Sequence, residues 1–105
     1  MAGFVRVASL EELPDGALLG VEAEGKRICL ARLEDAVYAF ADNCTHRDFP
    51  LSNGELDPDD CTVTCEWHGA VFDVRTGEVR CPPAPRAVAT FTAEVRGGEV
   101  WVDVG

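Results

Sequence analysis

Apolar and polar residues alternate over short stretches along most of the chain, which is typical of strands that turn one face to a core. The first stretch runs from Phe4 to Ala8 and is followed by several of similar length. Glycine and acidic residues separate neighbouring stretches and indicate tight turns. Strands are therefore predicted over 4–8, 17–22, 27–31, 37–41, 61–64, 70–74, 78–80, 88–95 and 100–104.

The pattern predicts a single short helical turn. Ser9 is followed three positions later by Glu12, which is the spacing of a capping box, and Pro14 with Gly16 ends the turn. No long helix, internal repeat or linker is evident. The sequence thus predicts an all-β fold, an antiparallel β sandwich or barrel of short strands, in one domain over residues 1–105.

Charge narrows the possible partners. The 105 residues include 19 acidic and 9 basic side chains, so the formal net charge is −10. Nucleic acids and anionic membranes repel such a chain, and no apolar run is long enough to span a bilayer. The acidity suits docking on a basic partner surface, but it is equally consistent with a role in solubility alone.

Cysteine usage indicates a reducing compartment. The chain has five cysteines, an odd number, and its first residues lack the apolar segment of a signal peptide. We therefore expect a cytoplasmic protein without a disulfide framework. Cys29 lies in an apolar strand and is interpreted as a small buried hydrophobic residue, and Cys81 as a packed one.

Two short motifs carry the chemistry. Cys44 and His46 form a Cys-x-His pair, and Cys65 and His68 form a Cys-x-x-His pair that contains the only other histidine. Two thiolates and two imidazoles suit either a tetrahedral zinc site or a [2Fe–2S] cluster with cysteines on one iron and histidines on the other. Cys61 could replace Cys65 as a metal ligand, but the pair with His68 would then lose its Cys-x-x-His spacing.

The two motifs resemble the ligand set of Rieske iron–sulfur proteins. The resemblance extends to Gly69, to Phe72 and Asp73, to the Thr76 and Gly77 turn, and to the proline run at 82–85. It implies a cluster-binding region at about 42–86, with two hairpin loops plus a proline loop. The cofactor would be one Rieske-type [2Fe–2S] cluster, bound by Cys44, His46, Cys65 and His68. The gap between the motifs is longer than is usual in the family, and we expect the surplus in the turn-rich run 53–60.

The whole chain resembles the small Rieske ferredoxins of bacterial aromatic-ring dioxygenase systems. This implies a monomeric, non-catalytic electron carrier that docks transiently, by its cluster end, on a flavin or iron–sulfur reductase and on a terminal oxygenase. A mononuclear oxygenase iron would need two further histidines, which the chain lacks. The alternatives are a small subunit of another redox complex, such as a nitrite reductase, and a zinc-stabilised interaction module.

The resemblance also bears on the reduction potential. High-potential Rieske proteins have a disulfide between the ligand loops, where this chain has Phe49 and Trp67. They also have hydroxyl donors where this chain has Ala70 and Phe72. Because a hydrogen bond to sulfur favours the reduced state, we expect a potential near the lower end of the Rieske range.

Overall fold

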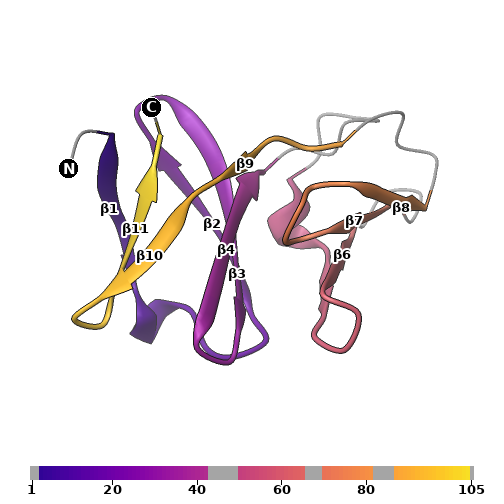
Figure 1. The fold of residues 1–105 in the computed structure, drawn as a ribbon, viewed down its shortest axis with the longest axis horizontal. Coiled ribbons are helices and arrows are strands. Elements are labelled where there is room, and N and C mark those ends of the chain that lie inside the picture. Colours follow the sequence, from indigo (N-terminus) through magenta and orange to yellow (C-terminus); the bar gives the residue numbers. More distant parts are fainter. Residues whose placement is uncertain (1–2, 43–49, 66–69, 82–86, 105) are drawn as a thin grey trace.

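The computed structural model describes residues 3–42, 50–65, 70–81 and 87–104. In these ranges it consists of three antiparallel sheets and two short 3-10 helices, so the predicted all-β class is confirmed (Figure 1). The elements are β1 (Phe4–Ser9), η1 (Leu10–Glu12), β2 (Leu18–Ala23), β3 (Lys26–Leu33), β4 (Ala36–Ala41), η2 (Leu51–Asn53), β5 (Glu55–Asp57), β6 (Thr62–Thr64), β7 (Val71–Asp73), β8 (Val79–Cys81), β9 (Thr90–Phe91), β10 (Ala93–Arg96) and β11 (Glu99–Asp103).

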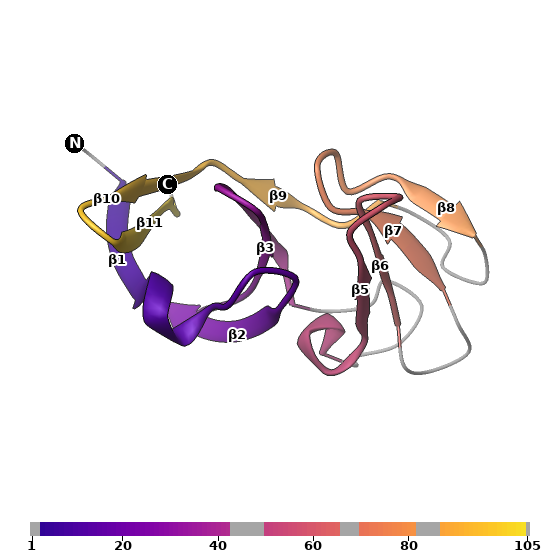
Figure 2. The same ribbon diagram turned by 90° about the horizontal axis from the view of Figure 1, so that it is seen from below.

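Two of the sheets curl around one core. Their strand orders are β1-β11-β10 and β2-β3-β4-β9, and together they form the ring seen in Figure 2. The core inside this barrel is apolar and consists of Ala8, Leu13, Ile28, Leu30, Ala39, Val100 and Val102. The predicted capping box is present at η1, where the Ser9 N–H donates to the Glu12 carboxylate at 2.8 Å.

The third sheet, in the order β5-β6-β7-β8, packs beside the barrel against its own core. Strand β3 is the shared wall. Ile28 and Leu30 face the barrel core, whereas Cys29 and Ala31 face the second core, together with Phe40 and Phe72. Because both faces of β3 are buried from Ile28 to Ala31, the sequence there is an apolar run and does not alternate.

The stretch at 88–95, predicted as one strand, divides between two sheets. Residues Thr90–Phe91 pair with β4, whereas Ala93–Arg96 pair with β11. At the break, the Thr92 carbonyl accepts the Asp103 N–H at 2.9 Å. The prediction of one continuous strand was therefore wrong, since alternation does not reveal where a strand changes its partner.

The run at 53–60 is more ordered than its composition suggested. Residues Glu55–Asp57 form β5, which pairs with β6, and only the residues after Asp57 form the expected turn. Gly54 is required for this approach, because a Cβ there would lie 2.0 Å from the Thr64 carbonyl oxygen. Cys61, predicted as the start of a strand, lies in the turn with φ +56°.

In the described ranges, the structure has no helix with the length and apolar character needed to cross a membrane.

Candidate metal centre

The structure places one of the four predicted ligands. Cys65 follows β6 directly and is 1% exposed, in the core shared with Leu51, Ala70 and Phe72. Its backbone N–H donates to the Ala70 carbonyl at 2.7 Å, so the chain leaves at Cys65 and returns beside it. Cys44, His46 and His68 lie outside the described residues, and their ligand roles stay predictions.

Hydrogen bonds also connect the two sides of the first motif. Asp42 follows β4 and is 6% exposed. Its two carboxylate oxygens accept the backbone N–H and the hydroxyl of Ser52, each at 2.7 Å. A Cβ at Gly20 would lie 2.7 Å from both the Asp42 and Ser52 oxygens, so glycine leaves room for this pair. Sequence reasoning missed Asp42 and Ser52, because neither lies inside a metal-ligand spacing.

The proline run is bordered in a similar way. Strand β8 ends at Cys81 on one side, and on the other side the Val88 N–H donates to the Gly77 carbonyl at 2.9 Å. Gly77 has φ +80°, and a Cβ there would lie 2.3 Å from the Val88 carbonyl oxygen. The expected turn at Thr76 and Gly77 is therefore confirmed, and it requires glycine.

The described residues that border the two motifs and the proline run lie in or beside the β5–β8 half or at the adjoining end of β4 (Figure 1). The bordering backbone is held by hydrogen bonds beside the strands, from Cys65 to Ala70 and from Val88 to Gly77. A metal centre carried there would be fixed by the sheets and would not depend on loop conformation alone.

The described part of the site fits an iron–sulfur cluster. Cys65 brings a thiol sulfur to the end of a strand among apolar neighbours that exclude water. Sulfur ligands in a shielded environment suit such clusters, whose potentials depend on burial and on hydrogen bonds to sulfur. Ala70 and Phe72 are both 0% exposed, and neither has a side-chain hydrogen-bond donor.

Cys29 has the structural role expected from the sequence. It is 0% exposed within β3, and burial, assisted by the nearby Asp42 carboxylate, raises the pKa of its thiol well above the ordinary value. A buried thiol of this kind stays protonated and unreactive.

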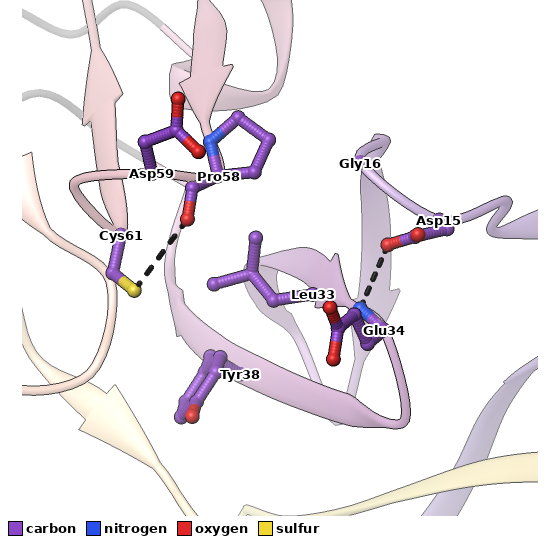
Figure 3. A pocket seen from close by; sticks show the side chains of 8 residues that line it. All are labelled: Asp15, Gly16, Leu33, Glu34, Tyr38, Pro58, Asp59 and Cys61. Carbon is purple, nitrogen blue, oxygen red and sulfur yellow. Dashed lines mark hydrogen bonds between the residues drawn. The ribbon is translucent and has the colours of Figure 1, made fainter.

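Cys61 lies at the opposite end of β6 from Cys65, and its Sγ lies 3.8 Å from the Pro58 carbonyl oxygen. It lines a cavity of about 440 Å³ between the β3–β4 hairpin and the turn after β5 (Figure 3). The other lining residues are Asp15, Gly16, Leu33, Glu34, Tyr38, Pro58 and Asp59. Within the described ranges, no three His, Cys, Asp or Glu side chains are grouped to hold a metal ion. Cys61 lies at the end of β6 away from the second motif, and the choice of Cys65 over Cys61 as the ligand stays a prediction.

A buried ion-pair network lies at the far end of β7. Asp73 is 2% exposed, and its carboxylate accepts hydrogen bonds from Arg75 and Arg80. Chiefly because the Arg75 side chain donates to it, the pKa of Asp73 lies well below its usual range, against the opposing effect of burial. The sequence motif contained Asp73 but gave no sign of its two arginine partners.

Comparison with known proteins agrees with this arrangement. The family described as the Rieske [2Fe-2S] domain matches residues 3–92. The ferredoxin component of the naphthalene 1,2-dioxygenase system of Pseudomonas aeruginosa is 33% identical over 101 residues, which cover 96% of this chain and 95% of the relative.

Two solved structures are similar over the same length. The ferredoxin of carbazole 1,9a-dioxygenase from Nocardioides aromaticivorans IC177 has a TM-score of 0.94 at 30% identity, covering 99% of this chain and all (100%) of that one. A chain in the complex of reduced oxygenase and oxidized ferredoxin in carbazole 1,9a-dioxygenase has a TM-score of 0.88 at 32% identity, covering 98% of this chain and 94% of that chain.

The family match implies a Rieske-type cluster as the cofactor, so the zinc alternative is not supported. The motif spacing, the buried Cys65, the three antiparallel sheets and the full-length similarity agree with one another. The chain therefore belongs to the Rieske [2Fe–2S] domain family.

Proposed function

We propose that this protein is the ferredoxin component of an aromatic-ring-hydroxylating oxygenase system, a one-electron carrier without catalytic activity of its own. The full-length similarity to ferredoxin components carries the proposal, because 96% of this chain aligns with 95% of the naphthalene 1,2-dioxygenase ferredoxin component. The histidine count supports it as well, since a mononuclear oxygenase iron would need histidines beyond His46 and His68.

The cluster ligands in this proposal are Cys44 and Cys65 on one iron and His46 and His68 on the other. When bound, the cluster supplies a site that accepts and releases one electron. The protein excludes water from Cys65 with apolar neighbours such as Leu51, and holds the bordering backbone through Cys65 and Ala70. It needs no proton donor or substrate pocket for this task.

The proposed partners are a reductase, with flavin or iron–sulfur centres, and a terminal oxygenase. The solved oxygenase–ferredoxin complex in the carbazole system supports docking on an oxygenase. We propose that docking is transient and uses the cluster end of a monomer, in the cytoplasm. The net charge of −10 suits a basic surface on either partner, because long-range attraction raises the rate of encounter.

The test begins with the visible spectrum, the iron and sulfide content, and the electron paramagnetic resonance (EPR) spectrum of the reduced protein. The wild type should contain two irons and two sulfides per chain, as the cluster type requires. Cys65→Ser should lose the cluster, as should replacement of Cys44, His46 or His68.

Cys61→Ser is the matched control, because it makes the same atomic change at the other end of β6. It should retain the full cluster content. A wild-type protein that contains zinc or no metal would contradict the proposal, as would a Cys65→Ser variant with an unchanged spectrum. Transfer of electrons from a reductase through the loaded protein to an oxygenase tests the carrier role itself.

A further inference from the structure

Strand β8 has an irregular register against β7. Val71 pairs with Cys81 and Phe72 pairs with Val79, so Arg80 is one residue more than the pairing with β7 needs. This is the arrangement of a β-bulge, which turns the extra side chain in a new direction and is common beside functional sites.

The bulged side chain reaches a buried carboxylate. Arg80 Nη2 donates to Asp73 Oδ2 at 2.5 Å, and Asp73 also accepts from Arg75, through the backbone N–H at 2.8 Å and Nη2 at 3.1 Å. The Arg80 side chain is 51% exposed, whereas the Asp73 side chain is 3% exposed. Because a buried carboxylate without its partner is strongly unfavourable, Asp73 holds Arg80 in the bulged position.

Asp73 also holds the turn that follows it. Its carbonyl accepts the Gly77 N–H at 2.7 Å, and the Gly77 carbonyl accepts the Val88 N–H at 2.9 Å. At its other end, β7 begins next to Ala70, whose carbonyl accepts the Cys65 N–H. Asp73 thus contacts the turn through its backbone carbonyl and the bulge through its carboxylate, at the end of the strand that begins beside Ala70.

We propose that Asp73, acting through Arg80, is a positioning residue for the iron–sulfur site. It fixes the bulged register of β8 against β7 and thereby the strand ends that border the cluster. This inference rests on the proposed function, since it assumes that the loaded protein contains a Rieske-type cluster.

The main test uses Arg80→Gln, which removes the charge that Asp73 holds. The half-exposed Arg80 side chain can be replaced without leaving a core cavity. Arg80→Lys is the conservative variant, because Arg80 contacts Asp73 through a single nitrogen that an ammonium group can replace. Arg6→Gln is the matched control, since Arg6 is 47% exposed, pairs with Glu99 and lies on β1 in the barrel.

The measurements are the EPR g values and midpoint potential of the cluster, and the half-life of its visible absorption, with circular dichroism to verify folding. Arg80→Gln should shift the g values and the potential and lose the cluster about tenfold faster than wild type. Arg80→Lys and Arg6→Gln should both retain wild-type g values and cluster lifetime.

Three outcomes would overturn the inference. These are an Arg80→Gln cluster identical to wild type, equal shifts in Arg80→Gln and Arg6→Gln, and an Arg80→Lys variant as impaired as Arg80→Gln. The equal shifts would indicate an effect of net charge alone. Failure of the proposed function is distinguishable, because the wild type itself would then lack the Rieske spectrum.

Discussion

At the scale of single residues, the described ranges of this acidic chain bury only two carboxylates. In the described ranges, Asp42 and Asp73 are the buried ones, and each is held by donors on neighbouring elements. Asp42 accepts two hydrogen bonds from Ser52, whereas Asp73 has two arginines. Asp42 follows β4 beside the first motif, whereas Asp73 lies at the end of β7 away from Cys65, so the two buried charges hold different parts of the fold.

Asp73 should make the stability of the fold depend on acid pH. The pKa of Asp73 in the folded protein lies below the pKa of an unfolded aspartate, which is about 4. The ionised carboxylate therefore stabilises the fold fully above about pH 4, and this stabilisation is lost as the pH falls toward the folded pKa. Asp73→Asn should therefore be less stable than wild type at pH 7, and its stability should depend less on pH between about 5 and 2. Urea unfolding at a series of pH values measures both effects. If the free energy of unfolding fell equally steeply with pH in both proteins, Asp73 would not be the group that causes the loss of stability in acid.

The apolar residues after the second motif bear on the redox potential. Ala70 and Phe72 are fully buried and offer no side-chain donor to sulfur. We expect a midpoint potential near the lower end of the range of about −150 to +300 mV known for Rieske centres. Direct titration of the cluster measures it, and Ala70→Ser, which adds a hydroxyl donor, should raise the value. A wild-type potential well above zero would contradict this expectation.

At the scale of elements, the strands that could be predicted each lie within a single sheet. Alternation located β1, β2 and β4 to within two residues, and the capping box located η1. The short strand β5 was missed because its Glu-Leu-Asp sequence is acidic and lies among turn formers. The four predicted ligands came from the two short motifs and their resemblance to the Rieske ligand set. The supporting residues Ser52, Arg75 and Arg80 were missed because their roles depend on contacts made only in the folded sheets.

The contact of Gly20 on β2 with the Asp42–Ser52 pair should be sensitive to the addition of one methyl group at Gly20. Gly20→Ala brings a Cβ within 2.7 Å of the Asp42 and Ser52 oxygens, so that pair must move. The variant should lower the free energy of unfolding by about 1–3 kcal/mol, as overpacking usually does, and should retain less cluster. Urea unfolding and iron content are the measurements. Ser52→Ala should be milder, because the Ser52 backbone donor remains. Wild-type stability in Gly20→Ala would show that the contact relaxes without cost.

At the scale of the whole molecule, the net charge of −10 should govern how fast partners meet. Electron transfer to the oxygenase should slow as salt is raised from about 0.05 to 0.5 M, because screening weakens long-range attraction. Stopped-flow absorbance of the cluster at each salt concentration measures this rate. A rate independent of salt would favour the alternative that the acidity serves solubility. The visible spectrum of the protein without its partner, recorded at each salt concentration, controls for loss of the cluster.

The pairing of Phe4 with Asp103 has a practical consequence. It brings the first and last strands of the chain side by side, and β1 and β11 lie across the molecule from β6, β7 and β8 (Figure 1). The longest extent of the molecule is 37 Å. A tether attached to β1 or β11 would anchor the protein to an electrode by its far side. The β5–β8 half, where we propose the redox centre, would then face the solution and its partners.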